Sequence, residues 1–397
     1  MDALTILTVF TLLVLLGLLI TWFSNKIKIS NVLLLILTGL LVGNLVQRAG
    51  IIAFSGDALV TIAIISLVII IFDGSSKFTS KSLNETGFQS LKVIGWFILF
   101  NILLLSPFVA VFFFEEFNLS YLLYGVIFAI IMGATDPATL FSMFKSKSNR
   151  VVEFLKVEAV LNTPITILLP FLFLDLIGYV GTTFELFEFY AIAFFNQIII
   201  GIGAGVSTGI VFFKAMKHFY SEQISPLAII CSALIAYILA ENLGGSGVLS
   251  VAVLGFVFGS VYITHKELLA GFSSMLSNSL EILVFLLLGF IIQIELSFVY
   301  FLKSILIFGL LLISRHLAIK LSLKDFNVKE QLFMTLSMPK GLGTAVLVFS
   351  LSVMEIAALS VVNNLVVVVM IYSLILSTAV NYYSKNFIRV TLDPNKV

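Results

Sequence analysis

The sequence contains few charged residues and only one cysteine. Asp, Glu, Lys and Arg together make up 11% of the 397 residues, whereas soluble domains carry about 25% charged residues. Hydrophobic residues make up 60% of the chain, and the mean hydropathy is +1.18. Because a soluble fold cannot cover this much apolar surface, the composition predicts an all-α polytopic membrane protein.

The same shortages exclude several classes of function. The single Cys231 cannot form an internal disulfide, and its apolar surroundings predict that it packs inside the protein. The net charge of +1 argues against nucleic acid as a partner. The three histidines are scattered, so no Cys/His cluster is present for a transition metal. The spans contain no nucleophile–base pair for an intramembrane hydrolase, so neither enzymatic activity nor a cofactor is expected.

Hydrophobic segments are long enough to count as membrane spans. A transmembrane helix needs about 20 mostly apolar residues. By this criterion the chain has thirteen candidate spans, near residues 2–23, 31–48, 57–74, 92–114, 120–144, 151–177, 188–213, 224–241, 246–263, 277–295, 299–319, 329–351 and 358–382.

The basic residues of the loops test this count independently, because cytoplasmic loops carry an excess of Lys and Arg. Seventeen basic residues fall in the loops of one side and in the C-terminal tail, and the opposite loops hold only Arg48 and Lys303. A missed or spurious span would scramble this alternation. The sequence therefore predicts thirteen spans, with the N-terminus outside and the C-terminus in the cytoplasm.

A short set of ionisable residues remains within the spans. A charge at bilayer depth costs about 2.5–3.5 kcal/mol on the milder insertion scale. Such residues either form structural ion pairs between helices or line the path of an ion or proton. Asp73 and Glu281 lie near the predicted cytoplasmic ends of their spans and are each candidates for interfacial anchors, although Asp73 is also placed to form a cytoplasmic entry funnel. The full set is Asp73, Asp136, Lys156, Glu158, Glu281, Arg315 and Lys340.

Two spans carry a proline next to a charged residue. Span 5 contains Asp136 followed by Pro137, and span 12 contains Pro339 followed by Lys340. Proline removes a hydrogen bond inside a helix but is favoured at the first position of a new helix, where Asp is a strong N-cap. Each motif therefore indicates a broken helix, although a single proline would also fit an ordinary kink.

The two breaks lie seven spans apart, so the two helices run in opposite directions. This spacing predicts an inverted repeat of spans 1–6 and 8–13, with discontinuous helices 5 and 12 crossing near the middle of the membrane. At such a crossing, Asp136 would offset the exposed helix N-termini and Lys340 the exposed C-termini.

Oxygen-bearing side chains gather around the first break and in span 6. Hard oxygen ligands suit a small cation such as Na⁺ or K⁺, which we place at Asp136 and Thr135. A carboxylate that binds either a proton or a cation, but not both, is the simplest form of an antiporter. Arg315 is the expected partner of Glu158, because leaving either charge unpaired is costly. The candidate ligands are Thr135, Asp136, Glu158, Asn162, Thr163 and Thr166.

These motifs, in this order, resemble the cation/proton antiporter superfamily in its NhaP-like sodium/proton exchanger branch. The resemblance covers essentially the whole chain. It is carried by "FDGSSKF" (72–78), "GATDPATL" (133–140), "VEAVLNTPITI" (157–167), "GSGVLSVAVLGFVFG" (245–259), "SRHLAIKL" (314–321) and "MPKGLGTAVL" (338–347).

The resemblance implies a homodimer in a prokaryotic cell membrane, in which a core slides against a dimerisation part. The dimerisation part would hold spans 1–3 and 8–10 (about 1–74 and 224–295), and the core spans 4–6 and 11–13 (about 92–177 and 299–382). Span 7 (188–213) would link them, and no soluble regulatory domain is expected.

One position departs from the family pattern. Where the family has Asn-Asp in span 6, this chain has Asn162 followed by Thr163. That aspartate is the family's main carrier of cations and protons, so Asp136 is left as the expected carrier. The sequence thus predicts a Na⁺/H⁺ or K⁺/H⁺ antiporter with elevator-type alternating access. The departure keeps two alternatives open on the same fold: a channel or uniporter, and a sensor that binds ions without transporting them.

Overall fold

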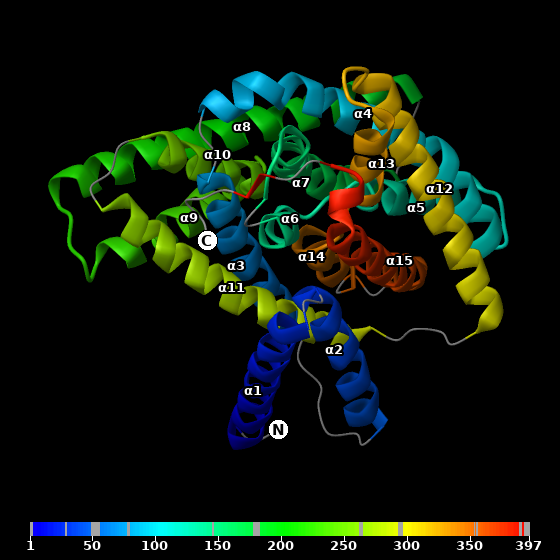
Figure 1. Cartoon of the computed structure of the whole chain (residues 1–397), viewed down its shortest axis with the longest axis horizontal. Helices are drawn as coiled ribbons and strands as arrows, with labels where there is room; N and C mark the ends of the chain where they lie inside the picture. Colours follow the sequence, from blue (N-terminus) through cyan, green and yellow to red (C-terminus); the bar gives the residue numbers. More distant parts are fainter. Residues whose placement is uncertain are drawn as a thin grey trace.

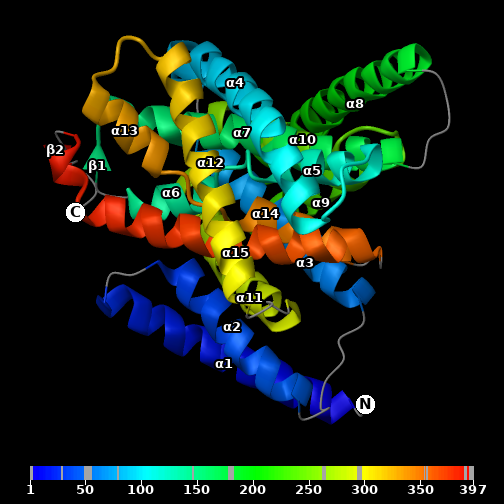
Figure 2. The same cartoon turned by 90° about the vertical axis from the view of Figure 1, so that its right-hand side faces the viewer.

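The computed structural model describes residues 3–27, 30–48, 56–77, 80–144, 147–177, 183–261, 265–292, 297–352, 354, 356–388 and 391–392. Within these residues the fold is helical (Figures 1 and 2). One short antiparallel pair joins β1 (Lys147–Ser148) to β2 (Thr391–Leu392), which the all-α prediction did not include.

The first helices are α1 (Ala3–Ile27), α2 (Asn31–Arg48), α3 (Gly56–Ser76), α4 (Ser80–Phe113), α5 (Leu119–Ile131), α6 (Pro137–Met143) and α7 (Arg150–Ile177). They are followed by α8 (Thr183–His218), α9 (Ser225–Asn242), α10 (Gly247–Ser260), α11 (Lys266–Ile291), α12 (Phe298–Ser322), α13 (Val328–Leu336), α14 (Leu342–Ser352) and α15 (Ala357–Tyr382). A 3₁₀ turn, η1 (Ser384–Asn386), follows the last of these helices.

Each predicted hydrophobic segment coincides with a helix or, for the fifth and twelfth, with a pair of short helices. Within the described residues, 7 helices are long and apolar enough to cross a membrane. The remaining segments carry shorter apolar helices, among them Asn31–Gly43, Val60–Ser76 and Gly247–Ser260. Large apolar side chains such as Leu18, Trp22 and Phe195 are exposed on the outer surface, as expected of helices that face lipid.

The tenth predicted segment begins too late. It was placed at 277–295, but α11 begins at Lys266, so Glu281 lies in the middle of a helix rather than at its end. The serines between 273 and 279 lowered the local hydropathy and hid the first turns. Two of these hydroxyls form hydrogen bonds within the protein: Ser274 Oγ donates to Asp73 Oδ1 at 2.6 Å, and Ser279 Oγ donates to the carbonyl of Met275 at 2.9 Å.

The expectation for Cys231 was also wrong. Its side chain is exposed on α9. An apolar run in a membrane protein meets either lipid or neighbouring helices, and hydropathy alone does not distinguish the two.

The helices pack in two neighbourhoods. In the first, α1 and α2 form a layer at one end of the molecule with α11 packed against α2, while α3 packs on α10 and α11, and α8 on α9 and α10 (Figures 1 and 2). In the second, α4 packs against α5, α7 and α12, and α12 also packs against α13 and α15. Helix α14 joins the two, because it contacts α3 and α11 as well as α15.

Candidate functional site

The two helix breaks touch each other deep inside the protein. The first break separates α5 from α6 and the second separates α13 from α14. The backbone N–H of Asp136 in the first break donates to the carbonyl of Pro339 in the second at 2.9 Å. Because this bond joins residues far apart in sequence, it fixes the two breaks side by side.

Asp136 binds the N-termini of two helices at once. It is the N-cap of α6, with Pro137 in the first turn, and its Oδ2 accepts a hydrogen bond from Thr139 N at 2.7 Å. Its Oδ1 accepts from Leu342 N, at the start of α14, at 3.1 Å. Helix N-termini carry partial positive charge, so both helices stabilise the carboxylate. The side chain is buried, with 5% of its surface exposed.

Lys340 binds the C-terminal end of α5. Its Nζ donates to the carbonyls of Met132 at 2.6 Å and Ala134 at 2.5 Å, which the end of α5 leaves without helical partners. The ammonium group also lies 5.5 Å from the ring centroid of Phe97 and is fully buried. A fixed cation therefore offsets the negative end of α5.

Glu158 and Arg315 form a buried ion pair between α7 and α12. Arg315 Nη1 donates to Glu158 Oε1 at 2.9 Å, and Nη2 to Oε2 at 2.8 Å, which is the bidentate geometry. Both side chains are completely buried, and the guanidinium lies 4.9 Å from the ring centroid of Phe97. The pair cancels its own charge, so Glu158 is not left as a free anion.

The neighbouring polar residues leave two oxygen atoms without partners. Asn162 Nδ2 donates to the carbonyl of Gly133 at 2.6 Å, and Thr163 Oγ1 donates to the carbonyl of Ala159 at 2.8 Å. Within the described residues, the buried atoms Asn162 Oδ1 and Thr135 Oγ1 accept or donate no hydrogen bond. Buried oxygens without hydrogen-bond partners are suitable ligands for a small cation.

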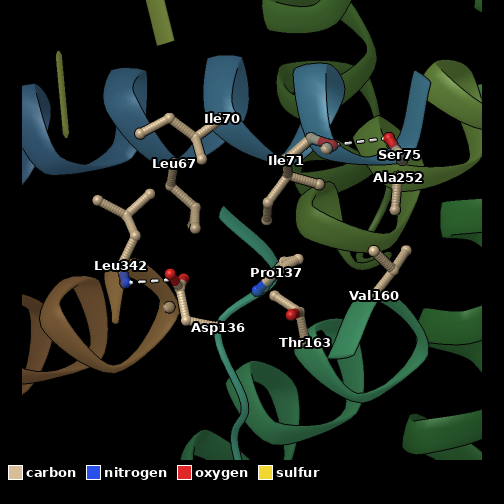
Figure 3. A pocket seen from close by; sticks show the side chains of 12 residues that line it. Leu67, Ile70, Ile71, Ser75, Asp136, Pro137, Val160, Thr163, Ala252 and Leu342 are labelled. Carbon is tan, nitrogen blue, oxygen red and sulfur yellow. Dashed lines mark hydrogen bonds between the residues drawn. The ribbon is translucent and has the colours of Figure 1, made fainter. Parts of the chain in front are cut away.

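A small cavity opens beside Asp136. Its volume is about 20 Å³, which is enough for one water molecule. Figure 3 shows Asp136 with Leu342 to its left, Thr163 and Val160 of α7 to its right, and Leu67, Ile70 and Ile71 of α3 above. The walls are mostly apolar, so the carboxylate and the Thr163 side chain supply most of the polar character.

Asp73 does not line this cavity, although its neighbours Gly74 and Ser75 do. Its Oδ2 pairs with Lys77 Nζ at 2.6 Å, and its Oδ1 accepts from Ser274 Oγ of α11 at 2.6 Å. The side chain is 5% exposed. Asp73 therefore joins α3 to α11, next to residues that line the cavity.

Sequence reasoning missed a polar link that supports the first break. Asn101 of α4 donates from Nδ2 to the carbonyl of Ala129 at 3.2 Å, and its Oδ1 accepts from Ser314 Oγ of α12. All three groups are buried. A lone amide in an otherwise apolar span was the available signal, since polar groups at membrane depth are rare. Nothing in the sequence indicated that the ring of Phe97 would lie close to the charged groups of both Arg315 and Lys340.

Broken helices that meet around buried charges, within a bundle of apolar helices, define a membrane transporter of the discontinuous-helix class. The chain belongs to the sodium/hydrogen exchanger family. The model of its transmembrane region, "Sodium/hydrogen exchanger, transmembrane", matches residues 10–382. It is a family of transporters and not of enzymes.

Among curated relatives, the K(+)/H(+) antiporter NhaP2 of Shewanella sp. strain MR-4 is 25% identical over 319 residues, covering 79% of this chain and 54% of that protein. A probable Na(+)/H(+) antiporter 2 of Methanocaldococcus jannaschii is 28% identical over 352 residues, covering 83% of this chain and 81% of that protein. The chain thus spans about half the length of the NhaP2 relatives it matches.

The fold is similar to that of the sodium proton antiporter MjNhaP1 from Methanocaldococcus jannaschii. The TM-score is 0.81, with 21% sequence identity, and the match covers 98% of this chain and 99% of that one. The two chains therefore share their overall helix arrangement.

Proposed function

We propose that this protein exchanges a monovalent cation, Na⁺ or K⁺, for a proton across the membrane, with Asp136 as the exchanging carboxylate. One observation carries the proposal. Among the described residues Asp136 forms no ion pair, whereas Glu158, which is also buried, is neutralised by Arg315. A buried carboxylate without a fixed cation needs a mobile one, and a proton or a metal cation fills the same place.

The groups around Asp136 supply the remaining ligands. Within the part of the chain that the structure describes, Thr135 Oγ1 and Asn162 Oδ1 have no hydrogen-bond partner, and Thr163 lines the cavity. The ion pair of Glu158 with Arg315 and the ammonium group of Lys340 hold the two helix breaks in place. These groups compensate buried charge and keep the same partners throughout exchange. The relatives named as K⁺/H⁺ and Na⁺/H⁺ antiporters support a cation of this kind and leave the choice between the two ions to measurement.

We propose further that transport uses thirteen spans arranged as an inverted repeat, with α5–α6 and α13–α14 as the crossed helices. The core of spans 4–6 and 11–13 would move against spans 1–3 and 8–10 of a homodimer, with span 7 as linker. The division of helix packing into two neighbourhoods supports this arrangement. The loop charges support an external N-terminus and a cytoplasmic C-terminus, and Asp73 would lie on the cytoplasmic route.

The assay uses purified full-length protein in proteoliposomes with a trapped pH dye. Adding Na⁺, K⁺ or Li⁺ outside should change the internal pH, and the change should persist when the membrane voltage is clamped. Cation flux that needs no proton gradient would indicate a channel or uniporter. Cation binding without flux would indicate a sensor, and the antiport proposal would then fall.

Gly341 offers a test of the geometry at Asp136. A Cβ added at Gly341 would overlap the carboxyl group of Asp136, whereas one added at Gly309 of α12 would meet nothing within 4 Å. We expect Gly341→Ala to displace the carboxylate and lower the exchange rate by about tenfold or more, because misplacing a binding group by about 1 Å costs up to a hundredfold.

Gly309→Ala is the matched control and should keep most of the wild-type rate, because an added methyl group there meets open space. Both variants are compared in the same dye assay at equal protein density. Equal rates for the two variants would show that the position of Asp136 relative to α14 does not govern exchange.

A further inference from the structure

Phe97 of α4 is an aromatic residue that lies next to two cations of the candidate site. The guanidinium group of Arg315 lies 4.9 Å from the centroid of its ring, and the ammonium group of Lys340 lies 5.5 Å from it. Both distances are within the range of about 6 Å over which the face of an aromatic ring attracts a cation. This attraction is strongest where water is excluded, and all three side chains are completely buried.

The two cations differ in the other groups that stabilise them. Arg315 has a bidentate ion pair, although its Nε atom is buried without a hydrogen-bond partner in the described part of the chain. Lys340 forms no ion pair with any residue that the structure describes. Its ammonium group has three N–H donors, and the two carbonyls at the end of α5 take two of them. The ring of Phe97 therefore gives Lys340 an attraction that Arg315 obtains mainly from its carboxylate partner.

The position of the Lys340 ammonium group affects both helix breaks. Its two carbonyl acceptors flank Gly133, immediately before Thr135 and Asp136 in the first break. In the second break, Pro339 directly precedes Lys340, and its carbonyl accepts a hydrogen bond from Asp136 N at 2.9 Å. Lys340 is thus joined to the first break both through its side chain and through the backbone of its neighbour. A displaced ammonium group would therefore also displace the groups proposed to bind the cation.

We propose that Phe97 is a positioning residue of the exchange site. The face of its ring holds the Lys340 ammonium group at the end of α5, and this contact fixes the break that carries the cation ligands. Phe97 acts through Lys340 and not by contact with the transported ion. The inference rests on the proposed antiport and deepens it. An aliphatic side chain at this position would fill the space but would leave the buried ammonium group without the attraction of the ring.

The test weakens the face of the ring while keeping its shape. Phenylalanine with one, two or three fluorine atoms replaces Phe97, because each fluorine draws electron density from the ring face and hardly alters the volume. The matched control is the same series at Phe285, which is also completely buried and has no cation over its ring among the described residues. Phe97→Leu removes the ring altogether. Exchange in proteoliposomes is measured against Na⁺ and K⁺ concentration, and thermal unfolding in detergent is measured on the same proteins.

We expect the cation concentration for half-maximal exchange to rise stepwise with the number of fluorine atoms at Phe97. Three fluorine atoms should raise it by about tenfold, because the attraction between a desolvated cation and a ring face corresponds to about this factor. The maximal rate should change much less, and the unfolding temperature should fall in the same order. Phe97→Leu should show at least the effect of three fluorine atoms, and the Phe285 series should match wild type in both measurements.

A half-maximal concentration that does not depend on fluorination would overturn the positioning role while leaving antiport intact, even if Phe97→Leu raises it or the unfolding temperature falls. Equal effects in the Phe285 series would overturn it too, because they would come from fluorine in a packed core. Absence of exchange in wild type would overturn the proposed function instead, and equal unfolding temperatures across the Phe97 series would then contradict the attraction between ring and ammonium group. If Phe97→Leu does not fold, the fluorinated proteins decide alone, since they keep the shape of phenylalanine.

Discussion

Asp136→Asn is expected to abolish exchange while leaving the fold intact. Asparagine is as good an N-cap as aspartate, so its single amide oxygen can keep the bond from Thr139 N, whereas its amide nitrogen cannot accept the bond from Leu342 N. The variant removes the negative charge that attracts the cation and the group that carries the proton. Leaving a buried charge without its partner costs about 3–5 kcal/mol, which corresponds to a loss of about a hundredfold or more in cation affinity.

The measurement is the internal pH change of proteoliposomes after addition of Na⁺ or K⁺. Asp325→Asn is the control, because Asp325 is exposed between α12 and α13 and should show the wild-type rate. Cation protection in thermal unfolding provides a second readout, which should be lost in Asp136→Asn alone. Intact exchange in Asp136→Asn would show that another group carries the ions.

Removing one partner of the buried ion pair is expected to destabilise the protein strongly. Arg315→Met leaves Glu158 charged, completely buried and without its bidentate donor. It also removes the guanidinium from the face of Phe97. Breaking a buried pair in this way costs about 3–5 kcal/mol, whereas replacing both partners by apolar groups is often nearly neutral.

The double variant Glu158→Met/Arg315→Met should therefore recover most of the stability that Arg315→Met loses. Denaturant titration in detergent micelles compares wild type, both single variants and the double variant as one cycle. Lys329→Met is the control, since Lys329 is exposed on α13 and its replacement should change stability by less than about 0.5 kcal/mol. A double variant no more stable than Arg315→Met would show that the cost does not come from the unpaired charge.

Several features could be predicted because they depend on local chemistry. Long apolar runs position the helices, and an Asp-Pro step or a Pro-Lys-Gly step inside such a run ends one helix and starts another. The pairing of Glu158 with Arg315 could be predicted because a buried charge without a partner costs free energy, and few opposite charges were available at membrane depth. The start of α11 did not follow, because serines lowered the local hydropathy, although Ser274 and Ser279 form hydrogen bonds within the protein.

The sequence by itself determined a helical membrane protein with two broken helices. It also determined which acidic and basic residues are available to compensate the partial charges of the exposed helix ends. Only the tertiary structure decided which atoms meet: Lys340 Nζ on the carbonyls of Met132 and Ala134, and Leu342 N on Asp136. The physical reason is that helices apolar on every side carry little periodic signal of which face is buried. Their rotation and neighbours are set by packing between residues distant in sequence.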